Sequence, residues 1–378
     1  MDKDKKPEWF DRENPDQFTS VVRRGVEVAH DQASFVKNNR FKKKAKQDIN
    51  IDEWAAGILA GNRTIMARAI TLIESNAEQH FRKAQDLLQK ILPYSGKSIR
   101  IGITGVPGAG KSTFIEAFGT YLCDLGFKVA VLAVDPSSSL SGGSILGDKT
   151  RMEQLSRNPQ AFIRPSPSAG KLGGVHRKTR ETMILCEAAG FDVILVETVG
   201  VGQSEVIVRD MVDFFMLLVL TGAGDELQGM KKGIMELADA IIVNKADGPN
   251  KQLANKTKAE YNRILHFLQP ATKGWTTKAS TCSALENEGM EDIWKLIRQF
   301  EETTKETGVF EERRRSQTKE WIYSMIIDQL QISFFYDQNI KALLPKIENE
   351  VIAGSRTVTS AVEELFSVYA GRSNNEPL

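Results

Sequence analysis

The sequence predicts an α/β fold with a mostly parallel sheet, flanked by helical regions at both ends of the chain. Between residues 96 and 307, six short apolar runs that are typical of buried strands alternate with segments of helical character. A Gly-rich stretch, 105–112, follows the first run and precedes a helical segment, which is the context of a phosphate-binding loop. The predicted strands are 99–104, 128–134, 191–196, 214–220, 240–243 and 277–282.

The composition argues against several classes of protein. The 50 basic and 49 acidic residues give a net charge of +1, so the overall charge does not indicate nucleic-acid binding. The three cysteines are far apart and odd in number, which argues against a disulfide framework and for a reducing compartment. Residues 1–6 lack an apolar signal core, and the longest apolar run, 214–220, is far too short to cross a membrane. We therefore expect a soluble, cytoplasmic protein without a membrane or nucleic-acid partner.

Changes in composition divide the chain into four predicted regions. Residues 1–50 form a polar extension, and its basic cluster at 37–46 is either a surface for an anionic partner or a solvated face. Residues 51–95 have the apolar spacing of helices. Residues 96–307 form the nucleotide domain, and residues 308–378 are all-helical without a catalytic constellation.

The Gly-rich loop is predicted to hold the phosphates of a nucleoside triphosphate. Its glycines let the backbone bend and bring N–H groups close to phosphate oxygens, and the following helix N-terminus adds positive potential. The Lys111 ammonium can reach the β- and γ-phosphates, and the Ser112 hydroxyl can hold Mg²⁺. The predicted binding residues of this loop are Gly105, Val106, Pro107, Gly108, Ala109, Gly110, Lys111, Ser112 and Thr113.

A second motif predicts that the base is guanine. Asn244, Lys245 and Asp247 follow the fifth predicted strand and fit the pattern Asn-Lys-x-Asp. The carboxylate of Asp247 can accept hydrogen bonds from the ring N–H and the exocyclic amine of guanine, and a polar site of this kind rejects the wrong ligand by roughly 10⁴-fold. Lys245 can stack its stem over the base, and Asn244 can brace the loops. Backbone donors to the guanine carbonyl are predicted at Ser283, Ala284 and Leu285, after the sixth strand.

Acidic residues at strand ends predict the metal site. Ser112 is one expected Mg²⁺ ligand, and Asp135 and Glu197 lie at phosphate height, where they can contact the ion directly or through water. Asp148 lies in a Ser- and Gly-rich segment and is either a further ligand or a solvated loop carboxylate. The N–H of Gly200 can pair with a γ-phosphate, which would give this loop two states.

The residue after this glycine predicts slow hydrolysis. Small GTPases carry a water-orienting Gln there, whereas this chain has Val201, with Gln203 two positions further on. We therefore expect a partner or a rearranged loop to accelerate hydrolysis. Residues 221–233 are either an ordinary connection capped by Asp225 or a third switch segment whose Lys231 compensates for the missing Gln. The predicted catalytic residues are Lys111, Glu197, Gly200, Asp225 and Lys231.

The sequence does not decide the role of residues 166–175, and it assigns no metal site to the histidines. Residues 166–175 are either a further anion contact or the flexible start of a helix. The four histidines are scattered, and none has metal-ligand spacing with a cysteine, so a zinc or nickel site is not expected.

Taken together, these motifs resemble the methylmalonyl-CoA mutase-associated GTPase family, cobalamin-enzyme chaperones formerly described as arginine-transport kinases. Residues 222–229 are specific to this family and separate it from other GTPases, whereas residues 1–50 are longer than the family leads us to expect. The resemblance is carried by residues 105–113, 134–138, 197–205, 222–229 and 244–247, and it extends to 67–74 and to the helices near 321–354.

The resemblance implies a P-loop GTPase that forms a homodimer through its C-terminal helices. It also implies a GTP-gated role in loading adenosylcobalamin onto an acyl-CoA mutase, methylmalonyl-CoA mutase being the expected one, and in protecting that enzyme from inactivation. The mutase would stimulate hydrolysis, which is consistent with Val201 in place of Gln.

Two other functions stay open. The first is a metallochaperone-like GTPase that delivers nickel, which the lack of a His/Cys cluster disfavours. The second is a phosphotransferase acting on a transport protein, for which the sequence shows no acceptor-binding motif or catalytic base.

Overall fold

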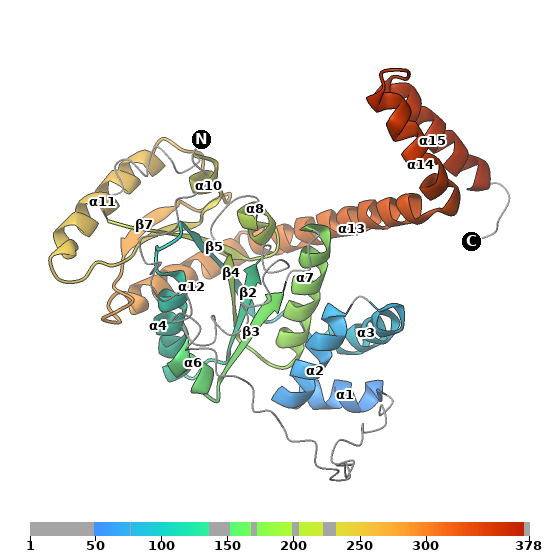
Figure 1. Cartoon of the computed structure of the whole chain (residues 1–378). Helices are drawn as coiled ribbons and strands as arrows, with labels where there is room; N and C mark the ends of the chain where they lie inside the picture. Colours follow the sequence, from blue (N-terminus) through green and yellow to red (C-terminus); the bar gives the residue numbers. More distant parts are fainter. Residues whose placement is uncertain are drawn as a thin grey trace, which may run out of the picture. The chain divides into compact units, whose positions relative to one another are not determined.

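The computed structural model describes residues 49–75, 77–135, 152–167, 172–198, 204–221 and 232–373. In this part of the chain, seven parallel strands form one sheet with the order β3-β2-β4-β1-β5-β6-β7 (Figure 1). The predicted α/β fold is confirmed, and the described sheet is parallel throughout. The strands are β1 (Ile99–Gly105), β2 (Val129–Asp135), β3 (Ala161–Pro167), β4 (Val193–Thr198), β5 (Phe214–Val219), β6 (Ala240–Val243) and β7 (Lys278–Thr281).

The sequence analysis missed one strand, β3. It pairs with β2 from Ala161, opposite Val129, to its last residue, Pro167. Arg164 and two prolines interrupt its apolar pattern, so it does not read as a buried strand. β3 lies at the edge of the sheet, where a strand has one neighbour and a proline without an N–H group is tolerated.

Helices cover both faces of the sheet, and this explains why most strands are apolar without alternation. On one face, strand residues such as Ile101 and Phe214 pack against α4 (Lys111–Asp124) and α12 (Met290–Glu306). On the other face, Ile194 and its neighbours pack against α7 (Leu172–Ala188) and α8 (Ser204–Arg209), as Figure 1 shows. Shorter or peripheral elements are η2 (Leu92–Tyr94), α6 (Glu153–Arg157), α10 (Lys232–Leu237) and α11 (Asn250–Leu265).

Within residues 49–98, three helices precede the sheet, as the apolar spacing predicts: α1 (Ile51–Leu59), α2 (Arg63–Glu74) and α3 (Glu78–Ile91). Their buried face joins the core around α7. Asn50 and Asn62 cap α1 and α2, because each side-chain oxygen accepts hydrogen bonds from backbone N–H groups in the first turn.

After α12, the described part of the chain continues with three more helices: α13 (Val309–Tyr336), α14 (Gln338–Ile352) and α15 (Val358–Ser373). α13 begins at Val309, within the region that the sequence predicts to be all-helical. Asp337 caps α14, and Gly354 follows its end with φ +71°, in the left-handed region that favours glycine. Ile340 and Ile347 pack against α15 in a small separate core. None of the helices in the described ranges combines the length and the apolar character that a membrane span requires.

Buried ion pairs attach the start of α13 to the sheet, at the ends where the strands begin. The Arg314 guanidinium contacts both carboxylate oxygens of Asp213, at 2.7 and 2.6 Å, and donates to the carbonyl oxygens of Gly96 and Ser98. Asp213 also accepts from the backbone N–H of Arg100 in β1, at 2.8 Å. Its side chain is 1 % exposed, and a carboxylate so buried needs such partners to remain charged.

The substitution Arg314→Ala should lower the free energy of unfolding by about 3 kcal/mol, because it leaves the buried charge of Asp213 without its cation. The urea midpoint, followed by circular dichroism, measures this change. The matched control is Lys295→Ala, which removes an ion pair to Glu291 whose two side chains are 68 and 66 % exposed. It should cost less than about 1 kcal/mol. An equal loss of unfolding free energy for the two substitutions would contradict a stabilising role of the ion pair between Arg314 and Asp213.

Candidate nucleotide-binding site

The predicted phosphate-binding loop connects β1 to α4, and its glycines are required by close neighbours. Gly105 and Gly110 have φ values of +154° and +84°, which side-chain-bearing residues rarely adopt. A Cβ atom at Gly105 would stand 2.3 Å from the carbonyl oxygen of Leu218 in β5. A Cβ atom at Gly110 would stand 2.7 Å from Nδ2 of Asn244. The glycines therefore let the loop pack tightly against β5 and the loop after β6.

Lys111, the first residue of α4, folds back over this loop. Its Nζ donates hydrogen bonds to the carbonyl oxygens of Gly105, at 2.8 Å, and Val106, at 3.3 Å. Burial lowers the pKa of Lys111, and the charges of Glu197 and Glu205 oppose this shift. An ammonium has three donors, so one remains for a phosphate oxygen while the two carbonyls hold the group in place.

Ser112 and Glu197 meet beside the loop. The Ser112 Oγ donates to Oε1 of Glu197 at the end of β4, at 3.0 Å. Behind them, Thr198 Oγ1 donates to Thr104 Oγ1, at 2.8 Å, and this buried bond joins β4 to β1. A hydroxyl beside a carboxylate is a set of oxygen donors that suits Mg²⁺. Asp135, a further predicted ligand, ends β2, but its side chain lies outside the described part of the chain.

Asn244, directly after β6, connects three loops with one buried side chain. Its Nδ2 donates to the carbonyl oxygen of Ala109 in the phosphate-binding loop, at 2.9 Å. Its Oδ1 accepts from the backbone N–H of Ala284, at 3.2 Å, and from the Cys282 thiol, at 3.3 Å. Burial raises the pKa of Cys282 to about 12, so the sulfur keeps the proton that it donates. These hydrogen bonds are the contacts expected of a side chain that braces the loops, which is the role predicted for Asn244.

The residues predicted to read the base lie around the same loop. Ser283 Oγ donates to Oδ2 of Asp247, at 3.1 Å, and orients that carboxylate. Lys245 is exposed and has a positive φ of +59°, and Leu285 is 78 % exposed, so both side chains stand at the surface of the site. The N–H of Ala284, predicted to face the guanine carbonyl, instead donates to Asn244 in this structure.

Several predicted residues lie outside the described part of the chain. They are Gly200, Asp225 and Lys231, predicted for catalysis, and Asp148, predicted for the metal. Their roles stay predictions. Of the undecided segment 166–175, the first two residues end β3 and the last four begin α7.

Sequence reasoning missed the residues that support this site from behind. Thr104 and Thr198 form the buried bond described above, and Ser283 was expected only for its backbone. Glu205 in α8 is 2 % exposed, and its Oε2 has no hydrogen-bond partner among the described residues. No motif signals the bonds of Thr104, Thr198 and Ser283, because each of these bonds joins segments that are distant in the sequence.

The class of the protein follows from this arrangement together with its relatives. A Gly-rich loop between β1 and α4, a hydroxyl and a carboxylate beside it, and an Asn-Lys-x-Asp loop after β6 define a P-loop GTPase. The sequence profile described as "Methylmalonyl Co-A mutase-associated GTPase MeaB" matches residues 66–339. The chain belongs to this family of GTPases.

Individual relatives agree with this assignment. GTPase ArgK of Escherichia coli is 46 % identical over 297 residues, which are 78 % of this chain and 90 % of that protein. A mouse protein described as "Methylmalonic aciduria type A homolog, mitochondrial" is 42 % identical over 337 residues, 86 % of this chain and 81 % of that protein. The crystal structure of a LAO/AO transport system kinase, 36 % identical, superposes with a TM-score of 0.70 and covers 86 % of this chain and all of that one.

The substitution Asn244→Ala should weaken GDP binding about tenfold or more, because it leaves the Ala109 carbonyl and the Ala284 amide without their partner. Isothermal titration calorimetry gives the affinity. Asn262→Ala is the matched control, since the Asn262 amide oxygen braces the edge strand β7 at Ala279, at 2.9 Å. The control should bind GDP like the unmodified chain. Unchanged affinity for Asn244→Ala would show that the three loops hold their positions without this side chain.

Proposed function

We propose that this GTPase is a chaperone of an adenosylcobalamin-dependent acyl-CoA mutase, and that methylmalonyl-CoA mutase is its partner. The observation that carries this proposal is the family match over residues 66–339, because the family is described by its association with that mutase. In this role the bound nucleotide gates loading of the cofactor and protects the mutase from inactivation.

The site supports a division of labour for GTP binding. Residues 105–113 hold the phosphates, and Lys111 places its remaining donor on the β- and γ-phosphates. Asp247, oriented by Ser283, reads guanine, and Asn244 holds its loop against the phosphate-binding loop. Ser112 and Glu197 would hold Mg²⁺ beside the phosphates, with Asp135 and Asp148 as further candidates for that ion. When bound, Mg²⁺ supplies charge stabilisation for the transferred phosphoryl group.

Slow intrinsic hydrolysis fits a gating role. A timed signal requires that GTP persists until the partner is engaged, and Val201 in place of a water-orienting Gln favours such persistence. Gly200, Asp225 and Lys231 are the proposed residues through which the partner accelerates the reaction.

A second candidate function comes from the solved relative. That protein is named as a transport system kinase. For this chain, the corresponding function is transfer of the γ-phosphoryl group to a transport protein rather than to water. The two functions differ in the acceptor of the phosphoryl group, so one labelling experiment separates them.

The proposal predicts that methylmalonyl-CoA mutase raises GTP turnover by about tenfold or more, a reduction of the barrier by roughly 1.4 kcal/mol. Turnover is measured with γ-labelled GTP, with and without the mutase, and Lys111→Ala provides the inactive control. The label should appear in inorganic phosphate. Label on protein would favour the kinase function, and neither stimulation nor a complex on gel filtration would contradict the chaperone role.

We also propose a homodimer through the C-terminal helices. On α13, Ile322, Ile326 and Leu330 are 56, 49 and 58 % exposed, and their i, i+4 spacing puts them in one stripe. Val358, Val362 and Phe366 form a similar exposed stripe on α15. Apolar stripes of this size mark interaction surfaces, and a second copy of the chain offers the same stripes in return.

The substitution Ile326→Glu should convert the dimer into a monomer, because a charge in an apolar interface loses its hydration without gaining a partner. Light scattering coupled to gel filtration gives the mass. The control is Arg263→Glu, which changes the charge at an exposed position of α11, outside the C-terminal helices. A monomeric unmodified chain, or a dimer that survives Ile326→Glu, would argue against this interface.

A further inference from the structure

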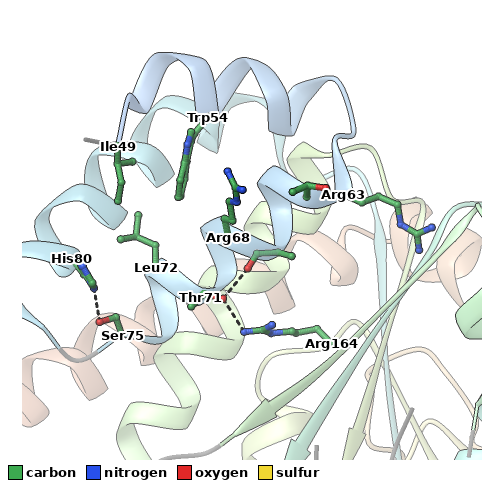
Figure 2. Close-up of a pocket in the computed structure, with 11 residues that line it drawn as sticks. Ile49, Trp54, Arg63, Arg68, Thr71, Leu72, Ser75, His80 and Arg164 are labelled. Carbon is green, nitrogen blue, oxygen red and sulfur yellow. Dashed lines mark hydrogen bonds between the residues drawn. The ribbon is translucent and has the colours of Figure 1, made fainter. Parts of the chain in front are cut away.

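A cavity of about 700 Å³ lies among the N-terminal helices and β3 (Figure 2). This volume is in the range of small-molecule sites. None of the nucleotide-site residues lines it, so it is a second place where a ligand could bind. The lining residues come from α1, α2, α3 and β3, with Ile49 preceding α1; the ones used below are Trp54, Arg63, Thr64, Arg68, Thr71 and Leu72.

One part of the cavity is apolar. Figure 2 shows Trp54 extending from α1 and Leu72 from α2 into the space between the two helices. The Trp54 side chain is half-buried and packs against the core around α7. An indole ring held in this way offers a flat surface to another ring.

The other part of the cavity is cationic. Among the described residues that line it are Arg63, Arg68 and Arg164, and none of these lining residues carries a carboxylate. Arg164 is neutralised by Glu74 and donates to Thr71 Oγ1, and Arg63 donates to the carbonyl oxygen of Ala161. Arg68 has no hydrogen-bond or ion-pair partner among the described residues, and Figure 2 shows it on α2, directed towards Trp54. Within the described part of the chain, the Arg68 guanidinium therefore lies unpaired at the cavity, beside an aromatic ring.

The sequence of α2 is divided between the core and this cavity. Met66, Ala69, Ile70 and Ile73 are buried against α7 and its neighbours. Ala67, Arg68, Thr71, Leu72 and Ser75 line the cavity, at the i, i+4 spacing of a helix face. Residues 67–74 are also a stretch on which the family resemblance rests, and the nucleotide site uses none of them.

We propose that this cavity binds an organic phosphate that carries an aromatic ring, such as a nucleotide or a coenzyme with a nucleotide part. The ring lies against Trp54 and Leu72, and the phosphate receives the paired N–H groups of Arg68. A guanidinium matches phosphate geometry with two parallel hydrogen bonds, and the Thr64 hydroxyl provides a further donor for a remaining oxygen. The Thr71 hydroxyl is already used, since it donates to the carbonyl oxygen of Ala67 at 2.9 Å. This site goes beyond the proposed chaperone function and does not depend on it.

The test is calorimetric titration of the full chain after saturation with GDP and Mg²⁺, so that the nucleotide site is filled. The probes are AMP, coenzyme A and inorganic phosphate. We expect AMP or coenzyme A to bind with one-to-one stoichiometry, and inorganic phosphate to bind at least about tenfold more weakly, because it lacks the ring. AMP binding identifies a simple nucleotide as sufficient, whereas binding of coenzyme A alone identifies the larger coenzyme as the ligand.

Variants assign the binding to this cavity. Arg68→Ala should weaken the probe about tenfold or more, as expected for loss of a charge-assisted hydrogen bond. Arg68→Lys should recover part of the affinity, since it keeps the charge but not the paired donors. A ring stacked on Trp54 should also change the tryptophan fluorescence of the chain when the probe binds. Trp54→Phe should keep binding and abolish that change. Arg263→Ala, which removes an exposed cation on α11, is the control and should change nothing.

Two results would overturn the proposal: no heat with any probe at millimolar concentration, or equal affinity of Arg68→Ala and the unmodified chain. Circular dichroism checks that each variant is folded. GTP turnover of Arg68→Ala should equal that of the unmodified chain. Calorimetry therefore tests the ligand site in the cavity, and GTP turnover with the mutase tests the chaperone proposal independently.

Discussion

The nucleotide site depends on one buried side-chain amide, which lies beyond the carboxyl ends of the parallel strands. The parallel order brings the ends of β1, β4, β6 and β7 together, but their loops are separate segments of chain. Asn244 connects three of these loops, because its amide can donate to Ala109 and accept from Ala284 at the same time. The distance between the phosphate-binding loop and the base-reading loop is thereby set by a single side chain.

At the amino ends of the strands, buried ion pairs attach the sheet to α13. Arg314 and Arg313 at the start of α13 pair with Asp213 and Asp239, two carboxylates that precede β5 and β6. These carboxylates also accept from backbone N–H groups of β1 and β5, so the same ion pairs hold both the strands and the helix. The helix that carries the proposed dimer stripe is thus attached to the strands whose other ends form the nucleotide site.

Most of the fold could be predicted from the sequence because its strands are buried on both faces and therefore apolar. β3 could not, since an edge strand needs no continuous apolar run and can carry Arg164 and prolines. Within the site, the phosphate-binding loop and the Asn-Lys-x-Asp motif have fixed spacing, so both can be recognised in the sequence. The bond between Thr104 and Thr198 and the hold of Ser283 on Asp247 join distant segments, and no local pattern records them.

By itself, the sequence determined the class of fold, because buried strands are apolar. It also determined the GTPase activity and the family, because the loops that bend around phosphates or read a base are contiguous in the chain. Only the tertiary structure decided which groups hold those motifs in place and which surfaces remain for other ligands. The side chains of α2 illustrate this difference. Their apolar spacing predicts a helix, but the arrangement of Arg68 beside Trp54 arises only when α1 and α2 pack together, since the contact between two helices is set by their shared core.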